Sequence, residues 1–250
     1  DLPCHNQELS NALAKYTLVY LDKNSVTLEQ AFEIYDNFIK DFNSDLQIFA
    51  KSQKYPYEFG TDQRSFNRLE YDVVLLLSVL VSPHRYQLME KLWKQSPPAS
   101  SACYIGCGPG LEIYLTQARF QSLKAFDAEL NPLLKDIFPD VQFQQAYFPT
   151  DALTVKFDAI YLIEILEHLS DPLQLLRDSE KHLNDRGRIY LTTATNLPQY
   201  DHYYNFPADH TAFEADISAM GLRIVLNSEI PHQYAEADIA AKNHYYILQK

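Results

Sequence analysis

The feature that most constrains the fold is a glycine-rich turn, Gly106-Cys107-Gly108-Pro109-Gly110, which directly follows an apolar run at residues 102–105. The chain contains 6 glycines, whereas average usage of about 7% would give roughly 17. Three of the six are in this turn, and a helical stretch begins at Leu111. Glycines let the backbone turn sharply and let a ligand lie against it, and a helix N-terminus favours negative charge. The turn therefore predicts a strand–turn–helix unit of an α/β fold.

The rest of the chain supports an α/β fold with a helical N-terminal region. Residues 1–95 show apolar side chains at a spacing of three to four residues, which indicates helices that form a cap or lid. A linker rich in Ser and Pro occupies residues 95–101, so we predict a second unit at residues 96–250. Short apolar runs there alternate with helical stretches, which predicts a mostly parallel sheet covered on both faces. Strands are expected at residues 102–105, 123–126, 141–145, 157–163, 188–193, 222–226 and 244–248, the last two as an antiparallel edge pair.

Charge and composition exclude several classes of partner. The 250 residues include 21 Lys+Arg and 33 Asp+Glu, which gives a net charge of −12, whereas nucleic-acid backbones select basic surfaces. The longest apolar stretch, residues 73–81, is far shorter than a membrane span, and no signal pattern precedes it. The 3 cysteines form no disulfide framework. We therefore expect a cytoplasmic protein that binds neither nucleic acid nor membrane.

An acidic residue follows the turn at the position expected for a nucleoside site. Asp127 ends the second predicted strand, 17 residues after Gly110, and a carboxylate there can accept both hydroxyls of a ribose. The glycine spacing is G-x-G-x-G, shorter than the G-x-G-x-x-G of dinucleotide sites. This spacing counts against an NAD(P)-dependent oxidoreductase, which stays an alternative.

Residues 99–250 resemble the class I S-adenosylmethionine-dependent methyltransferases. The first motif of that family is commonly an apolar strand followed by G-C-G-x-G. Further matching segments follow in order: Ala125-Phe126-Asp127-Ala128, Phe157-Asp158-Ala159-Ile160, Leu166-Glu167-His168-Leu169-Ser170-Asp171-Pro172, Leu183-Asn184-Asp185-Arg186-Gly187-Arg188-Ile189 and Ala219-Met220-Gly221-Leu222-Arg223. The resemblance implies a Rossmann-like sheet of seven strands in the order 3-2-1-4-5-7-6. It also implies that S-adenosylmethionine lies above strands 1 and 2, held by Gly106, Cys107, Gly108, Gly110, Asp127 and Ala128.

The sequence departs from the family pattern around the adenine. Where the family often has Asp after the third strand, this chain reads Ala146-Tyr147-Phe148. Tyr147 or Phe148 is expected to stack on the adenine instead. The acidic residue that the family often carries before the glycines is replaced by Tyr104 and Ile105.

Catalytic candidates follow the fourth and fifth predicted strands. His168 titrates near neutrality and suits proton removal from an acceptor, although it could instead buttress the loop. Glu164, at the end of the fourth strand, is a second candidate. His210 follows the fifth strand in a loop rich in His and Tyr, where neighbouring Asp209 suits an N-cap.

Substrate contacts are expected from that loop and from the cap. His202 and Tyr203 belong to the loop, while Tyr57 and Tyr71 come from the helical region, where they could also simply pack. Arg64 is expected to meet the carboxylate of the cofactor. The spacing of the histidines and acids matches no closed zinc pattern, so we predict no metal.

These observations together predict a methyltransferase that transfers a methyl group by direct displacement to a small-molecule acceptor, in a setting such as specialised metabolism. No N/D-P-P-Y/F motif follows the fourth predicted strand, which disfavours a nucleic-acid base as acceptor. The acceptor could also be tethered to a carrier protein, and the sequence does not indicate the oligomeric state. The rival from another class is a non-catalytic module that senses the cofactor or binds a partner.

Overall fold

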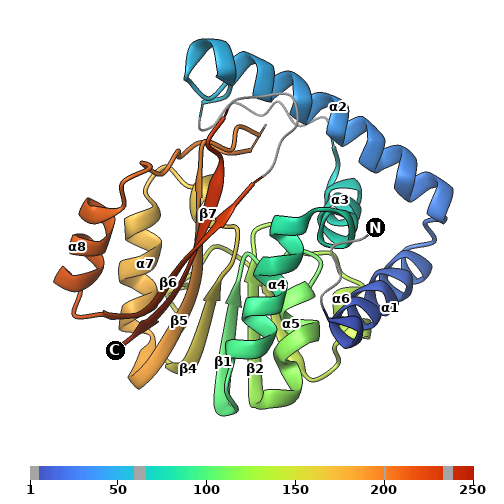
Figure 1. Cartoon of the computed structure of the whole chain (residues 1–250). Helices are drawn as coiled ribbons and strands as arrows, with labels where there is room; N and C mark the ends of the chain where they lie inside the picture. Colours follow the sequence, from blue (N-terminus) through green and yellow to red (C-terminus); the bar gives the residue numbers. More distant parts are fainter. Residues whose placement is uncertain (1–5, 59–65, 200, 233–238) are drawn as a thin grey trace.

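A central sheet organises the molecule. The computed structural model describes residues 6–58, 66–199, 201–232 and 239–250, and within them a seven-stranded sheet has the order β3-β2-β1-β4-β5-β7-β6 (Figure 1). Its strands are β1 (Ala99–Ile105), β2 (Phe120–Asp127), β3 (Val141–Gln145), β4 (Phe157–Leu162), β5 (Leu183–Thr195), β6 (Arg223–Pro231) and β7 (Lys242–Gln249). The strand order that the resemblance to the methyltransferases implies is confirmed.

The pairing is parallel except at one side of the sheet. Strands β1 to β5 pair in parallel, whereas β7 runs antiparallel to both β5 and β6. The sheet starts earlier than expected, because Ala99 already pairs with Phe120 inside the predicted linker. Strand β5 also starts earlier than expected, at Leu183, which pairs with Phe157 of β4. The predicted turn at 183–187 is therefore part of an irregular strand.

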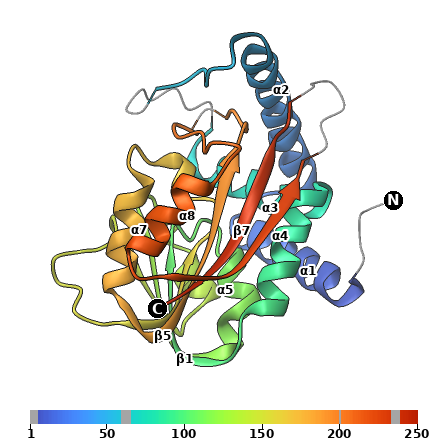
Figure 2. The same cartoon turned by 60° about the vertical axis from the view of Figure 1, so that its left-hand side comes forward.

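Helices cover both faces of the sheet. Alternate strand side chains point to opposite faces, and the two faces bury separate apolar clusters. One face carries α1 (Gln7–Lys23), α3 (Arg68–Val81), α4 (Pro83–Gln95) and α5 (Leu111–Thr116); the other carries α7 (Pro172–Lys181) and α8 (Thr211–Ala219). Figure 2 shows α7 and α8 together on one side of the sheet and α3 and α4 on the other. Short elements complete the chain: η1 (Gln117–Arg119), α6 (Leu134–Ile137) and η2 (Leu166–His168).

Three stacked tyrosines fill the face beneath the N-terminal helices. Tyr104, Tyr161 and Tyr190 stand side by side on β1, β4 and β5. The ring centroids of each neighbouring pair are 4.8 Å apart, with nearly parallel planes. All three belong to the same core cluster as Leu13 of α1. The N-terminal helices and the sheet therefore share one core, and the proposed division at residues 95/96 stays a prediction.

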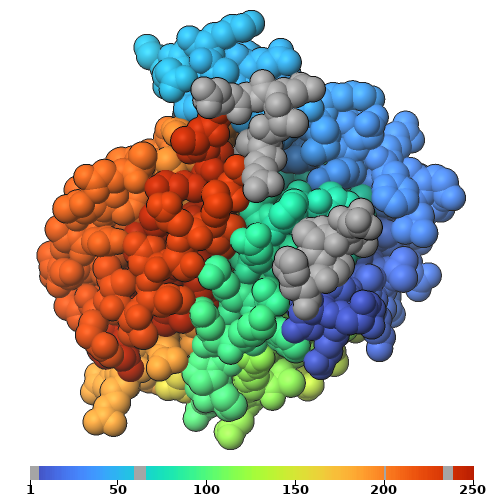
Figure 3. Space-filling model, in the orientation of Figure 1, coloured from blue at the N-terminus to red at the C-terminus, as the bar shows by residue number. Residues whose placement is uncertain are grey.

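Helix α2 (Leu28–Ser52) extends over the carboxyl ends of the parallel strands (Figure 1). In the space-filling view of Figure 3, the light-blue residues around position 50 form the top of the molecule. The helix starts at a capping box. The Thr27 side chain accepts a hydrogen bond from the Gln30 N–H, and the Gln30 side chain accepts one from the Thr27 N–H. Near its end, Phe42 and Leu46 pack against Ala194 and Leu197 at the end of β5. This contact places α2 above the edge of the sheet where a ligand is expected.

No helix in the described part of the chain combines the length and apolar character needed to cross a lipid bilayer.

Candidate functional site

A cavity of about 880 Å³ lies at the carboxyl ends of the parallel strands. The glycine turn, the end of β2 and the segments after β4 and β5 form its floor, while α2 and α3 contribute the side toward the cap. In open α/β sheets, ligands bind in this place. The predicted site residues that line the cavity are Tyr71, Gly106, Cys107, Gly108, Asp127, Ala128, Tyr147, Phe148, Glu164, His168, His202 and Tyr203.

The first and third glycines of the turn have different roles. All three glycines have a positive φ: 67° at Gly106, 50° at Gly108 and 81° at Gly110. Residues other than glycine rarely adopt this backbone conformation. A Cβ on Gly106 would lie 2.6 Å from Ile165 Cδ1 at the cavity wall. A Cβ on Gly110 would lie 2.8 Å from Phe138 Cε2, in the core beneath α1. Gly110 is not among the residues that line the cavity, and its lack of a side chain lets Phe138 pack closely. Its cofactor contact stays a prediction.

Asp127 lies at the cavity edge with both carboxylate oxygens occupied. Oδ1 accepts hydrogen bonds from the Glu129 N–H at 3.0 Å and Arg68 Nη1 at 3.1 Å. Oδ2 accepts from the Gly108 N–H at 2.9 Å and Arg68 Nη2 at 3.2 Å. Arg68, the first residue of α3, thus forms a bidentate ion pair with the carboxylate that we predict binds the ribose. A ribose diol can reach these oxygens only if the Arg68 guanidinium moves aside.

Replacing Arg68 with alanine is expected to tighten binding of S-adenosylhomocysteine about threefold to tenfold, because the ribose would no longer compete with the guanidinium. Calorimetric titration measures the change, and Arg223→Ala, an exposed arginine on β6, is the control. Weaker binding by Arg68→Ala would show that Arg68 holds the cofactor instead of excluding it.

The Glu164 carboxylate also forms an ion pair and a hydrogen bond with neighbouring side chains. Its Oε2 forms an ion pair with Arg85 Nη1 at 2.6 Å, and its Oε1 accepts from Asn243 Nδ2 at 2.9 Å. The backbone has a positive φ of 51°, and its N–H donates to Thr192 Oγ1 at 2.7 Å. These contacts hold the carboxylate at the cavity wall. Proton removal by Glu164 would require it to leave Arg85.

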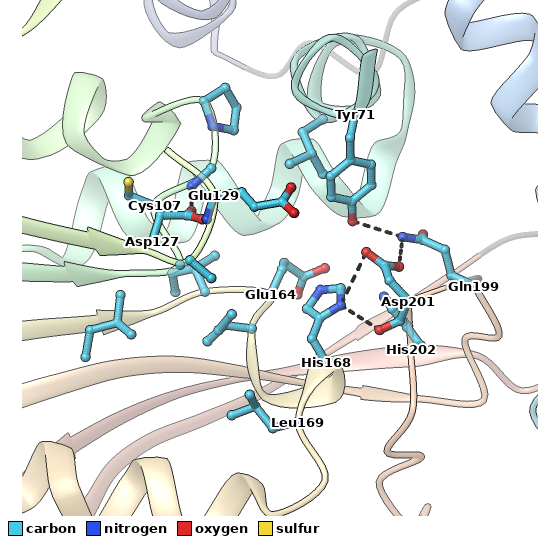
Figure 4. Close-up of a pocket in the computed structure, with 18 of the residues that line it drawn as sticks. Tyr71, Cys107, Asp127, Glu129, Glu164, His168, Leu169, Gln199, Asp201 and His202 are labelled. Atoms are coloured by element: carbon cyan, nitrogen blue, oxygen red, sulfur yellow. Dashed lines mark hydrogen bonds and ion pairs between the residues drawn. The ribbon is translucent and has the colours of Figure 1, made fainter. Parts of the chain in front are cut away.

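His168 lies beside Glu164 in the cavity and contacts Asp201 (Figure 4). Its Nδ1 donates to the Asp201 carbonyl oxygen at 2.8 Å and lies 3.4 Å from Asp201 Oδ2 (Figure 4). Burial would lower the pKa of His168, but the Asp201 and Glu167 carboxylates raise it above the ordinary value. Burial, and then the charge of His168, lower the pKa of His202 to about 4. His168 is thus the histidine of this pair that gains a proton more readily.

Glu167 lies directly behind these histidines. It is fully buried, and neither carboxylate oxygen has a hydrogen-bond partner among the described residues. Burial and the nearby Glu164 carboxylate raise the pKa of Glu167 to about 8. Glu167, His168 and His202 each offer one ligand atom, and these atoms lie within 4.8 Å of one another. The structure therefore gathers a possible ligand set where the sequence analysis predicted no metal.

Tyr71 extends the polar wall formed by His168 and Asp201. Its hydroxyl accepts a hydrogen bond from Gln199 Nε2 at 3.0 Å, and the same amide donates to Asp201 Oδ1 at 2.8 Å. Tyr57 does not line the cavity; its hydroxyl donates to Asp45 Oδ1 of α2 at 3.0 Å. Arg64 lies outside the described residues.

His210 lies away from the cavity, so its predicted catalytic role is not supported by its position. Its Nδ1 lies 2.7 Å from the Tyr246 hydroxyl, and its ring centroid lies 3.9 Å from that of His244. The chain after β5 turns away from the cavity before α8, and His210 packs between α8 and β7. The N-cap of α8 is His210 and not Asp209 as predicted, although Asp209 Oδ1 accepts a hydrogen bond from the Thr211 N–H at 2.9 Å.

Sequence reasoning missed Arg68, Arg85 and Gln199, all of which line the cavity. The capping box between Asn67 and Glu70 indicates that a helix begins at Arg68. No local signal shows that Arg68 faces Asp127, because the two residues meet only through the tertiary fold.

The comparisons with known proteins agree with this architecture. A family model described as a methyltransferase domain matches residues 84–221, more than half of the chain. Among curated proteins, no sequence matches at a significant level.

Solved structures resemble the fold at low sequence identity. The N-methyltransferase NodS from Bradyrhizobium japonicum, in complex with S-adenosyl-L-homocysteine, has a TM-score of 0.55 at 15% identity, covering 69% of this chain and 90% of that one. A putative S-adenosylmethionine-dependent methyltransferase from Listeria monocytogenes has a TM-score of 0.53 at 13% identity, covering 66% and 98%. The [4+2]-cyclase SpnF has a TM-score of 0.53 at 12% identity, covering 85% and 94%.

Three observations indicate the same family: the strand order, the glycine turn at the carboxyl ends of the strands, and the match to the family model. An S-adenosylmethionine cofactor is consistent with this family. The chain belongs to the methyltransferase domain family, among the class I S-adenosylmethionine-dependent methyltransferases.

Proposed function

We propose that the protein transfers the methyl group of S-adenosylmethionine to a small-molecule acceptor by direct displacement. The observation that carries this proposal is a single cavity that joins the glycine turn and Asp127 to the helices above them. Its volume of about 880 Å³ falls in the range of roughly 300–1,000 Å³ that is typical of small-molecule sites. The cofactor brings the reactive carbon, and the protein supplies position and exclusion of water.

The side chains that line the cavity favour an acceptor with an apolar body and a polar group. Phe38, Phe42 and Phe66 line the cavity on the cap side. On the other side, His168 and Asp201 offer a polar edge that orients an acceptor hydroxyl or amine, or takes up its proton. An acceptor from specialised metabolism, free or tethered to a carrier protein, fits this lining; neither nucleic acid nor membrane is part of the proposal.

As part of the same proposal, the protein acts in the cytoplasm, where free thiols such as the buried Cys103 and Cys107 persist.

One observation favours a second candidate, a module that binds the cofactor without methyl transfer. Arg68 contacts both oxygens of Asp127, so the carboxylate that would hold the ribose for methyl transfer is already engaged. SpnF, described as a [4+2]-cyclase, also shows that this architecture serves reactions other than methyl transfer.

Calorimetric titration with S-adenosylmethionine, S-adenosylhomocysteine and NADH tests the cofactor first. We expect one-to-one binding of the first two and none of NADH. Formation of S-adenosylhomocysteine over a panel of phenol, amine and carboxylate acceptors then tests turnover. Cofactor binding without turnover across the panel would favour the second candidate, and absence of cofactor binding would contradict both.

A further inference from the structure

We propose that Glu167, His168 and His202 form a binding site for one divalent transition-metal ion of the Zn²⁺ type. The three residues come from two segments, η2 after β4 and the loop after β5. One ligand atom from each lies within 4.8 Å of the other two. Two imidazoles and one carboxylate are a donor set that suits Zn²⁺ and similar ions.

The buried carboxylate is the observation that points to a cation. Glu167 is fully buried, and its two oxygens accept no hydrogen bond from any described residue. A carboxylate without a partner is costly in an apolar interior, and such groups are usually paired or bound to a metal. A cation between Glu167 and the two histidines would satisfy the carboxylate.

Both histidines have the hydrogen bonds that metal-binding histidines usually have. His168 Nδ1 lies 2.8 Å from the Asp201 carbonyl oxygen, and His202 Nδ1 lies 2.7 Å from the Leu197 carbonyl oxygen. A carbonyl oxygen only accepts, so each Nδ1 carries the proton and each neutral ring has its lone pair on Nε2. Ligating histidines typically donate their other N–H in this way, which fixes the tautomer and the ring orientation.

The backbone holds the two segments together before any ion binds. The N–H groups of Tyr203 and Tyr204 donate to the Glu167 carbonyl oxygen at 2.9 and 3.0 Å. His202 is therefore fixed beside η2, and its ring meets the His168 ring edge to face at a centroid distance of 4.9 Å. An ion with bonds of about 2.1 Å needs ligand atoms roughly 3.4 Å apart. The ligand atoms, which lie within 4.8 Å of one another, would therefore have to draw together by up to about 1.4 Å when the ion binds.

The site adjoins the cavity, because His168 and His202 line it while Glu167 stands behind them. Three protein ligands leave a fourth position for water or another oxygen. If methyl transfer is the reaction, a point that rests on the proposed function, an ion here would bind and polarise an acceptor oxygen. Metal binding itself requires neither the cofactor nor an acceptor.

The test is titration of the chelator-treated 250-residue chain with Zn²⁺ and with Co²⁺, whose visible absorption reports its coordination. We expect one ion per chain. Glu167→Gln and His202→Gln are each expected to weaken binding at least about 100-fold. His244→Gln removes a buried histidine that packs on His210, outside the cavity, and is expected to leave binding unchanged.

X-ray absorption of the Co²⁺-loaded wild-type protein needs no variant, and we expect two imidazoles in its ligand shell. The proposal is overturned if neither ion binds saturably, if both site variants bind as the wild type does, or if the spectrum lacks histidine ligands. A parallel titration of the metal-free protein with S-adenosylhomocysteine separates this result from the proposed function, because that binding does not depend on the ion.

Discussion

Replacing Asp127 with alanine is expected to weaken binding of S-adenosylhomocysteine at least about 100-fold, since two ribose hydrogen bonds to a charged carboxylate each contribute about 1.5–3 kcal/mol. The substitution also removes the acceptor that holds the Gly108 N–H at 2.9 Å. The glycine turn would therefore lose one of the contacts that fix its conformation at the cavity floor.

Calorimetric titration measures this loss, with Asp140→Ala as the matched control. Asp140 is an exposed aspartate just before β3, at the end of the sheet away from the cavity, and its replacement should leave the affinity unchanged. Asp127→Asn keeps the shape of the side chain but loses its charge, so we expect an intermediate affinity. Unchanged binding by Asp127→Ala would remove the ribose role from this residue.

The positions of the glycine turn and Asp127 could be predicted because they follow from local patterns. A short apolar run followed by clustered glycines indicates a strand and a turn, and the next apolar run places Asp127 beside that turn. Parallel pairing aligns Ile105 with Phe126, so the ends of β1 and β2 meet at one edge. The same reasoning placed Glu164 and His168 after β4, at the neighbouring edge.

Other features of the site could not be predicted because they depend on contacts between distant segments. Arg68 reaches Asp127 only after α3 packs over the sheet, and Arg85 reaches Glu164 in the same way. No local pattern shows that the absent side chain of Gly110 makes room for Phe138. His210 looked like a loop residue over the substrate, yet the path of the chain into α8 carries it to Tyr246.

The buried contact between α3 and α1 leads to the second large prediction, on stability. Asp72 is fully buried and pairs with Arg68 Nε at 2.9 Å. Its Oδ2 accepts from the Tyr20 hydroxyl of α1 at 2.5 Å, and that hydroxyl accepts from Asn131 Nδ2 at 2.7 Å. Removing one partner of a buried ion pair leaves the other charge poorly compensated. Asp72→Ala is expected to lower the free energy of unfolding by about 2–4 kcal/mol.

The chain provides a control with the same spacing in a different environment. Asp36 and Lys40 of α2 also form an ion pair four residues apart, at 2.6 Å, but their side chains are 65% and 67% exposed. Asp36→Ala is expected to change the free energy of unfolding by less than about 0.5 kcal/mol, because water screens and replaces such a pair. Chemical denaturation of both variants measures the difference. Equal, small effects would mean that Asp72 does not hold α1 and α3 together, and that apolar packing alone places Arg68 over Asp127.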